Sequence, residues 1–268
     1  MNSTADFKSP YCVLLSLKRD IMKKSPIFMT ICLAGAGLGS TLANADTIEV
    51  ISSGGFYSSM EKLIPLFEKQ TGHTVHLSSG SSMGASPTAI PNRLDRGERF
   101  DVVVLAAPEL SKLAEKGYVD PNSQSPLVNS SIGMAVPKGA PKPDISSAEK
   151  FEKVLLNAKH IGYSASASGT HLEKDVFPSF PPVEYKVISS KAEKVVGDRV
   201  AKRIAEGQFD IGFQQISEIK PFTGKYGQVE LVGPIPAPYQ KVTVFAAGIG
   251  KNSEHAKVAK ELIKFVKS

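Results

Sequence analysis

The chain reads His76-Leu77-Ser78-Ser79-Gly80-Ser81-Ser82-Met83-Gly84-Ala85-Ser86-Pro87 where a strand-like segment gives way to serines and glycines ahead of a helix-like one. Glycine lets the backbone bend so that N–H groups can face a ligand, and serine hydroxyls add further donors. The helix that follows brings a partial positive charge at its N-terminus. Such a loop can bind an anion, although many loops of this kind only connect a strand to a helix.

The same design recurs twice, at Ser52-Ser53-Gly54-Gly55 and over residues 164–170. One such loop is ordinary, but three in a short chain favour a shared anion site. The candidate ligand contacts are Ser53, Gly54 and Gly55 in the first loop, Ser81, Ser82, Met83 and Gly84 in the second, and Ser166, Ser168, Gly169 and Thr170 in the third. For each of them the alternative is a role as a helix cap or turn residue.

The first 45 residues are typical of an export signal rather than of a folded domain. Met22-Lys23-Lys24 is a basic start, residues 27–38 are apolar, and Ala43-Asn44-Ala45 is a small-residue cleavage site. The apolar stretch is too short for a membrane-spanning helix. We expect a periplasmic protein cleaved after Ala45, with translation starting at either Met1 or Met22.

Charge and cysteine content exclude several functional classes. The whole chain has a formal net charge of +6, but the leader is basic, so residues 46–268 keep only a weak positive balance. No Lys/Arg cluster with interleaved aromatic residues indicates nucleic-acid binding. Both cysteines, Cys12 and Cys32, precede the expected cut, so the exported chain has no disulfide, thiol nucleophile or thiolate metal site.

Strand-like and helix-like segments alternate after residue 46. Apolar runs predict strands over 47–51, 73–77, 101–105, 131–136, 160–163, 209–214, 229–232 and 241–247. Helical spacing predicts helices over 57–70, 89–96, 110–115, 148–158, 170–177, 197–206 and 256–266. Repeated units of this kind predict an α/β fold with mostly parallel sheets and flanking helices.

Four segments resemble, in the same order, type 2 periplasmic solute-binding proteins. They are the strand with Ser52–Gly55, Phe-Glu-Lys-Gln-Thr-Gly at 67–72, Gly-Glu-Arg-Phe-Asp-Val-Val at 97–103, and Gly-Gln-Phe-Asp-Ile-Gly-Phe-Gln-Gln at 207–215. The chain is most similar to the molybdate-binding branch. After the signal and upstream extension over 1–45, the resemblance implies lobe 1 over 46–130, lobe 2 over 131–240, and a return to lobe 1 over 241–268. It also implies two crossing strands, near 131–136 and 241–247, and a ligand cleft between lobes that close around it.

Departures from the molybdate-binding branch bear on the ligand. That branch offers a serine hydroxyl where this chain has Gly55, and a cleft tyrosine falls at Phe213. The second loop is also longer, by insertion of Met83 and Pro87. With two oxyanion donors missing, the expected ligand is a small organic di- or tricarboxylate rather than molybdate.

Three further side chains are candidates for such a ligand. Gln214 and Gln215 follow an apolar strand, where an amide can face the cleft. Arg93 could bind a carboxylate bidentately, but it could equally form an ion pair with a nearby acidic residue within its lobe. Arg199 is a weaker candidate of the same kind.

Two classes of function remain open. A carrier would hold a small anion for uptake, act as a monomer and deliver it to an ABC-type membrane transporter. Residues 89–98 and 213–217 also resemble a subgroup that includes aconitate isomerase, an exported enzyme with the same fold. Its allylic proton shift would need a positioned base but no metal or nucleotide cofactor. The candidate base is His171, with Asp198 and Glu173 as lesser candidates.

Rival chemistry has weaker support. Gly80-Ser81-Ser82-Met83-Gly84 matches the G-x-S-x-G elbow of α/β-hydrolases, but that elbow needs a helix directly after its serine. Here Pro87 is the predicted first helical residue. His73 and His76 are three apart in a predicted strand, so they face opposite sides and make a poor metal pair. Neither a P-loop nor a dinucleotide-binding turn is present.

Overall fold

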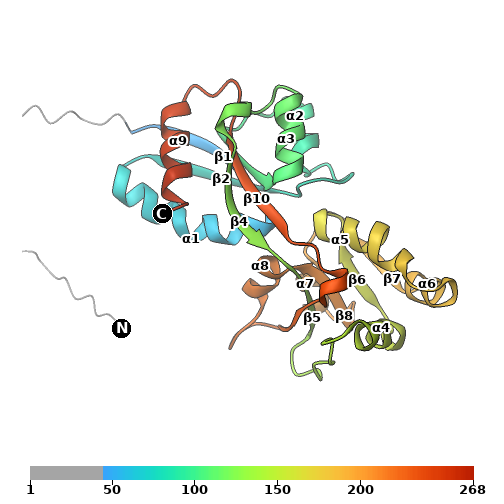
Figure 1. The fold of residues 1–268 in the computed structure, drawn as a ribbon. Helices are drawn as coiled ribbons and strands as arrows, with labels where there is room; N and C mark the ends of the chain where they lie inside the picture. The colour runs from blue at the N-terminus through green and yellow to red at the C-terminus, as the bar shows by residue number, and fades with distance from the viewer. Residues whose placement is uncertain (1–44) are drawn as a thin grey trace, which may run out of the picture. The chain divides into compact units, whose positions relative to one another are not determined.

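The computed structural model describes residues 45–268 of the chain. Residues 1–44, with most of the predicted export signal and both cysteines, lie outside this part. The described residues belong to one compact unit, Ala43–Ser268, which contains two β-sheets with their own helices (Figure 1). None of the helices described is both long and apolar enough to cross a membrane.

The first sheet has five strands in the order β2-β1-β3-β10-β4. Its strands are β1 Thr47–Ser53, β2 Thr74–Gly80, β3 Val102–Ala106, β4 Ser125–Ser130 and β10 Thr243–Ile249. Its helices are α1 Gly54–Thr71, α2 Ile90–Asp95, α3 Ala107–Glu115 and α9 Ala256–Phe265, with a 3₁₀ turn at Pro121–Ser123. We call this sheet and its helices the first lobe.

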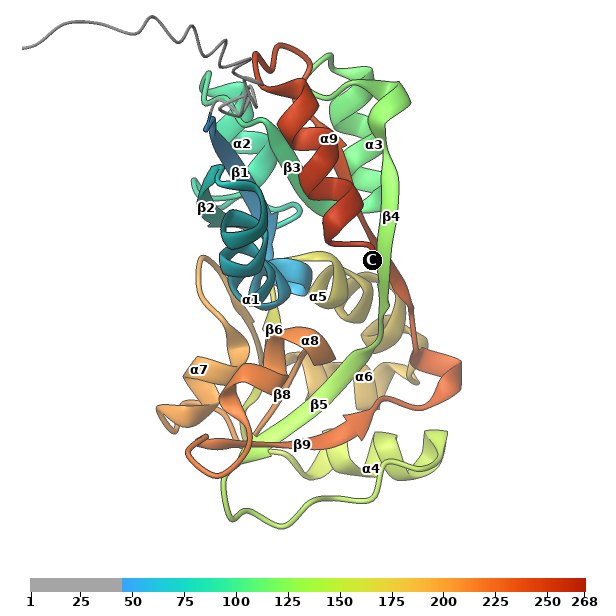
Figure 2. The same ribbon diagram turned by 90° about the vertical axis from the view of Figure 1, so that its left-hand side faces the viewer.

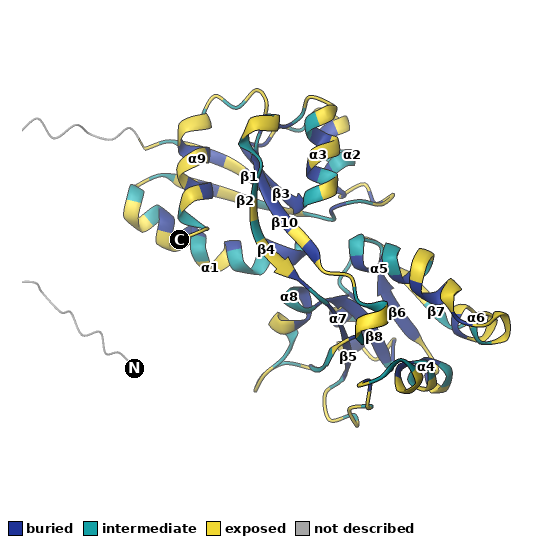
Figure 3. Cartoon of the chain, viewed as in Figure 1, coloured by how far each residue is buried: buried dark blue, intermediate teal, exposed yellow. Residues whose placement is uncertain are grey.

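The core of the first lobe covers both faces of its sheet. Helices α1 and α9 cover one face, where Met60 and Phe67 are buried against Val50. Helices α2 and α3 cover the other, where Leu110 is buried against Ile51. Because β3 lies in the middle of the sheet, it is buried along its whole length (Figure 3), which accounts for its unbroken apolar sequence.

The second sheet has five strands in the order β7-β6-β8-β5-β9. Its strands are β5 Ile132–Pro137, β6 Ile161–Ser164, β7 Ala192–Val195, β8 Ile211–Gln215 and β9 Val229–Pro234. Its helices are α4 Ala148–Asn157, α5 Ala167–His171, α6 Pro182–Ser189, α7 Val200–Ala205 and α8 Ile216–Ile219. A π-helical turn, Leu172–Val176, extends α5, and 3₁₀ turns lie at Phe177–Ser179, Lys220–Phe222 and Ala237–Tyr239. We call this sheet and its helices the second lobe.

The second lobe also has a core on each face of its sheet. On one face Phe213 packs edge-on against Phe151 of α4, with ring centroids 5.7 Å apart. On the other face Ile204 of α7 and Ile219 of α8 pack together. The helices thus hold β6 and β8 rigidly, and with them the polar residues at the strand ends.

The chain crosses between the lobes twice. The first crossing joins β4 to β5 at Ser131, and the second joins the turn Ala237–Tyr239 to β10 (Figure 2). Gln240 in the second crossing accepts a hydrogen bond from the Ile132 N–H at 2.8 Å and donates one to the Ile132 carbonyl at 2.9 Å. The two crossings are therefore tied to each other side by side.

The predicted α/β architecture with flanking helices is confirmed, with one reversed strand in each sheet. β10 runs antiparallel to β3 and β4, and β5 runs antiparallel to β8 and β9. Both follow a crossing, so they enter their sheet at the edge where the other strands end and must run the opposite way. The predicted start of a helix at Pro87 is wrong, because α2 begins at Ile90 and residues 86–89 form a turn.

Candidate functional site

The three serine- and glycine-bearing loops follow the carboxyl ends of parallel strands. β1 ends at Ser53, β2 at Gly80 and β6 at Ser164. In α/β sheets the carboxyl ends of the strands form the edge where ligands usually bind. The two lobes present these edges to one cavity, described below.

The first loop brings the N-terminus of α1 to the second lobe. Ser53 is 1% exposed, and its Oγ is the one buried side-chain polar atom among residues 45–268 without a hydrogen-bond partner. A buried hydroxyl left unpaired costs about 1–3 kcal/mol. Gly54 packs against the Glu218 carboxyl so closely that a Cβ at this position would overlap it. Gly55 lies instead against the Phe245 ring.

Most polar side chains of the second loop hold the loop itself. Ser81 Oγ donates to the Met83 carbonyl at 2.8 Å, and buried Ser82 Oγ accepts from the Ala106 N–H at 3.1 Å. Ser82 is therefore bonded within the lobe and does not form a nucleophile elbow. The loop also contacts the second lobe, because Gly84 lies against the Ala165 carbonyl oxygen.

The third loop is built on a short serine network. Ser164 Oγ and Ser168 Oγ are hydrogen-bonded at 2.9 Å, and the Gly169 N–H donates to Ser164 Oγ at 3.3 Å. Thr170 Oγ1 donates to the Met83 sulfur at 3.4 Å, a contact between the lobes. Ser166 precedes α5 and leaves its side chain unused as a cap.

All three loops line one cavity of about 460 Å³ between the lobes. From the first lobe it is lined by Gly54, Ser79, Gly80, Ser81 and Thr88, and from the second by Ser164, Ala165, Ser166, Val195, Gly197, Asp198, Arg199, Lys202, Gln214, Glu218 and Phe222. Of the predicted contacts, four therefore lie on its wall: Gly54, Ser81, Ser166 and Gln214. The others support the wall from behind or lie elsewhere.

Arg199 is a cation on this wall. It lies just before α7 and is half-buried, with its guanidinium 5.6 Å from the Tyr57 ring centroid and 5.9 Å from that of Phe222. These rings hold it from both lobes through cation–π contacts. Within residues 45–268 its guanidinium forms no ion pair. Its planar donors are thus available to a carboxylate ligand.

Glu218 is the buried acid on the same wall, and sequence reasoning missed it. It lies in α8, is 8% exposed, and forms no ion pair with any described residue. Burial raises the pKa of Glu218 to about 7, although Arg199, the Gln215 N–H and the Gln214 side chain act in the opposite direction. The sequence did offer one signal: Glu218 comes three residues after Gln215, the last residue of a strand whose end faces the cleft.

Asp198 differs from Glu218 although both line the cavity. Burial alone would raise the pKa of Asp198, but the Arg199 N–H and the Lys202 and Arg203 side chains together hold that pKa below its usual value. Lys202 Nζ lies 3.1 Å and Arg203 Nε 2.9 Å from its carboxylate. Asp198 is thus an ionised structural anion.

Sequence comparison places the chain in a family. The bacterial extracellular solute-binding protein family matches residues 48–268. The chain belongs to this family. An aconitate isomerase from Pseudomonas sp. is 37% identical over 247 residues, which cover 91% of this chain and 92% of that protein. A Bacillus subtilis (strain 168) protein named as an ABC transporter substrate-binding lipoprotein is 24% identical over 92% of this chain and 94% of its own length.

Solved structures show the same fold. The periplasmic molybdate-binding protein of Azotobacter vinelandii superposes with a TM-score of 0.61 at 23% sequence identity. The match covers 82% of this chain and 93% of that chain. The type 2 periplasmic binding protein fold is therefore established for this solute-binding protein.

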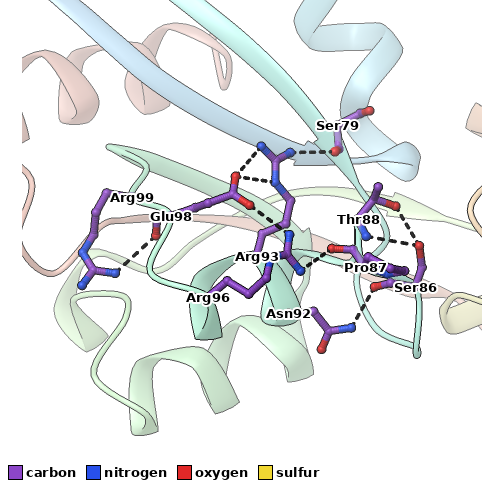
Figure 4. Close-up of polar contacts among 9 residues, drawn as sticks. All are labelled: Ser79, Ser86, Pro87, Thr88, Asn92, Arg93, Arg96, Glu98 and Arg99. Atoms are coloured by element: carbon purple, nitrogen blue, oxygen red, sulfur yellow. Dashed lines mark hydrogen bonds and ion pairs between the residues drawn. The ribbon is translucent and has the colours of Figure 1, made fainter.

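In this solute-binding protein the Arg93 side chain makes its contacts with residues of the first lobe. Its guanidinium pairs with Glu98 at 2.7 Å and donates to the Ser79 carbonyl at 3.1 Å (Figure 4). It also stacks over the Phe100 ring, 5.0 Å from the ring centroid. It is not among the residues that line the cavity. The geometry fits the alternative of an ion pair within the lobe, and we leave Arg93 out of the candidate site.

His171 and Gln215 are also placed away from the cavity wall. His171 Nδ1 lies 2.8 Å from Asp175 and Nε2 lies 3.0 Å from the Tyr239 carbonyl oxygen. Because both ring nitrogens face acceptors, His171 is a poor candidate for a free base. Gln215 Nε2 donates to Ser130 Oγ at 2.8 Å, and its Oε1 accepts from Thr243 Oγ1 at 3.0 Å. Gln215 thus joins the second lobe to the crossing strands.

The remaining predicted base, Glu173, forms an ion pair with Lys194 and accepts a long hydrogen bond from Tyr163. It too is absent from the cavity wall. A larger hollow of about 750 Å³ lies between α1, the crossing at Ser130 and Ser131, and α8. Of the three loops, it is reached only by Gly55, so we assign the candidate site to the smaller cavity.

Proposed function

We propose that this protein binds a small tricarboxylate in the cavity between its lobes and interconverts the cis and trans isomers of aconitate. The observation that carries the proposal is Arg199, a guanidinium that forms no ion pair within residues 45–268 and lies on the same cavity wall as the loop residues Ser81 and Ser166. A charge-assisted hydrogen bond contributes about 1.5–3 kcal/mol, and micromolar affinity needs about 8 kcal/mol. Arg199 with three or four loop donors is sufficient for such affinity.

The missing donors favour a carboxylate over a tetrahedral oxyanion. Gly55 packs on Phe245, and Phe213 is buried in the core against Phe151. Neither position can therefore offer a hydroxyl to the cavity. The likeness to a molybdate-binding protein concerns the fold, whereas the more similar relative is named as an aconitate isomerase.

The proposed reaction moves one proton and one double bond. A proton leaves the methylene carbon of aconitate, the resulting negative charge spreads over the allyl unit and its carboxylates, and a proton returns to the former vinyl carbon. Rotation during delocalisation, or protonation of a rotated conformer, leads to the other isomer. The exported location, with cleavage after Ala45, is part of the proposal.

The first prediction is turnover by the purified protein. Incubation with trans-aconitate is expected to produce cis-aconitate, and the reverse reaction is expected to reach the same ratio, as followed by liquid chromatography. A carrier, which the family and the Bacillus relative favour, would return the ligand unchanged. No conversion at high protein concentration, combined with a thermal shift by aconitate, would establish the carrier instead.

The second prediction concerns Arg199. Arg199→Ala is expected to weaken binding of trans-aconitate by roughly 10- to 150-fold, because one charge-assisted contact of about 1.5–3 kcal/mol is lost. Isothermal titration calorimetry measures the change. Arg99→Ala removes an exposed arginine outside this cavity and should leave the affinity unchanged. Equal affinity of the Arg199 variant and the wild type would remove Arg199 from the site.

A further inference from the structure

Glu218 is a buried carboxyl group that forms no salt bridge with any residue in the described part of the chain. Water and ion pairs normally stabilise a carboxylate, and burial without them disfavours the ionised form. Glu218 nevertheless lies on the wall of the interlobe cavity and against Gly54 at the start of α1. A hydrophobic residue or a glutamine would fill this position at lower cost to stability. The presence of a carboxyl group here therefore favours a functional role.

The groups around Glu218 come from three elements. Arg199, before α7, favours its ionised form, and so do the Gln214 side chain and the Gln215 N–H from β8. From α1, Gly54 lies against the carboxyl, and it carries no charge. Burial outweighs the favourable groups and raises the pKa of Glu218 to about 7. The carboxyl can therefore gain and lose a proton near neutral pH, which is the property a general acid–base group needs.

The other acids and histidines near the cleft lack this freedom. Asp198 is bound by Lys202 and Arg203, Glu173 by Lys194, and both nitrogens of His171 face acceptors. Among the described residues that line the cavity, Asp198 and Glu218 are the two acids. Of these two acids, Glu218 is the one whose carboxyl group forms no salt bridge with a described residue.

We propose that Glu218 is the catalytic residue that moves the proton of bound aconitate, an inference that rests on the function proposed above. The Glu218 carboxylate takes a proton from the methylene carbon, and the electron pair of that C–H bond forms a new double bond to the central carbon. The electron pair of the old double bond then takes the proton from the Glu218 carboxyl at the former vinyl carbon. The double bond moves by one position, and the carboxylate is regenerated with no other reactant.

Arg199 complements this step from the same wall. Negative charge spreads into the substrate carboxylates as the proton leaves, and a fixed guanidinium stabilises that charge without having to reorganise. Ser81 and Ser166 line the cavity from the two lobes. Ser166 Oγ makes no capping hydrogen bond, so it is placed to donate to a further carboxylate, which positions the reacting carbons next to Glu218.

The test separates binding from proton transfer in Glu218→Gln, which keeps the shape of the side chain but cannot take a proton. We expect kcat for aconitate isomerisation to fall by roughly 10²- to 10⁴-fold, the usual contribution of a general acid–base group. Affinity for the saturated analogue propane-1,2,3-tricarboxylate is expected to stay within about threefold of the wild type. Glu218→Asp, which retains an acid set back by one methylene, is expected to keep part of the activity.

Two further readouts exclude a merely structural role. In heavy water the wild type is expected to exchange the methylene protons of aconitate, and Glu218→Gln is not. The kcat/KM of the wild type is expected to rise with pH and level off above about 7, because the base must be ionised. If the wild type turns over aconitate and Glu218→Gln does so at the same rate, Glu218 is not the catalytic residue, whereas the proposed function stands. Loss of both analogue binding and turnover would make Glu218 a binding residue, and an inactive wild type would refute the proposed function as well.

Discussion

Replacing Glu218 by Gln is expected to stabilise the folded protein by an amount that grows as the pH rises. In the unfolded chain this carboxyl ionises near 4.5, whereas in the folded protein burial raises its pKa to about 7. Between these values the folded protein holds a proton that the unfolded chain has lost. Above about 7 it must hold a buried charge. The Glu218 contribution to wild-type stability is therefore fully present below pH 4.5 and is lost as the pH rises through 7.

The size of this effect follows from the pKa difference. One pKa unit corresponds to about 1.4 kcal/mol, so the stability gap between Glu218→Gln and the wild type is expected to widen by about 3 kcal/mol between pH 4.5 and 8.5. For a domain of this size, this corresponds to roughly 6–12 °C in Tm. Urea unfolding of both proteins at several pH values measures the gap.

A surface substitution controls for the change in net charge. Glu115→Gln removes an exposed carboxylate at the end of α3 and is expected to give a small gap that varies little with pH. A Glu218→Gln gap that stays constant from pH 4.5 to 8.5 would show that Glu218 ionises as freely in the folded protein as in the unfolded chain. That result would contradict the raised pKa of Glu218 in the folded protein.

Local patterns predict the loops of the candidate site because each loop follows a segment that the sequence identifies as a strand. Ser53 and Ser164 end strands that are mostly buried, and Gly80 ends β2, in which Val75 is the buried residue. The rule that ligands bind at the carboxyl ends of such strands then brings the loops together. In the structure, residues from all three loops line one cavity.

Individual ligand contacts are harder to predict, because a serine hydroxyl can form a hydrogen bond with a neighbouring protein group as readily as with a ligand. Ser82 accepts from the Ala106 N–H, and Ser168 is bonded to Ser164. These partners are distant in sequence or lie on the next turn, so residue type alone cannot separate a loop support from a ligand contact. The same holds for Arg93, whose partner Glu98 becomes a neighbour only through the turn after α2.

Sequence reasoning ranks Arg199 as a weak candidate and misses Glu218, for different reasons. The strand before Arg199, β7, lies at the edge of its sheet, and its Glu193 and Lys194 are exposed, so it shows no apolar run. Without that strand, Arg199 looks like part of a surface helix. Glu218 sits in a helix of one turn, Ile216–Ile219, too short for periodicity to detect. Its burial depends on contact with Gly54 of the other lobe.

Gly169→Ala is expected to destabilise the protein by about 2–4 kcal/mol, because the third loop has no room for a methyl group. A Cβ at Gly169 would overlap the carbonyl oxygen of Ser164, and it would lie 2.6 Å from the Ser164 carbonyl carbon and 2.9 Å from its nitrogen. These are backbone atoms of β6, held by pairing with β7 and β8, so they cannot rotate away. The start of α5 must move instead.

That movement would also change the site, which makes the substitution informative about function. It would break the bond from the Gly169 N–H to Ser164 Oγ and displace Ser166 on the cavity wall. We expect affinity for propane-1,2,3-tricarboxylate to fall at least tenfold, measured by calorimetry at a temperature where the variant is folded. Gly97→Ala is the matched control: its φ of 94° strains alanine by about 1–2 kcal/mol, but no atom crowds the added methyl group. If both variants lose similar stability and keep full affinity, the third loop does not shape the ligand site. If only Gly169→Ala loses affinity, the contact between α5 and β6 positions that wall of the cavity.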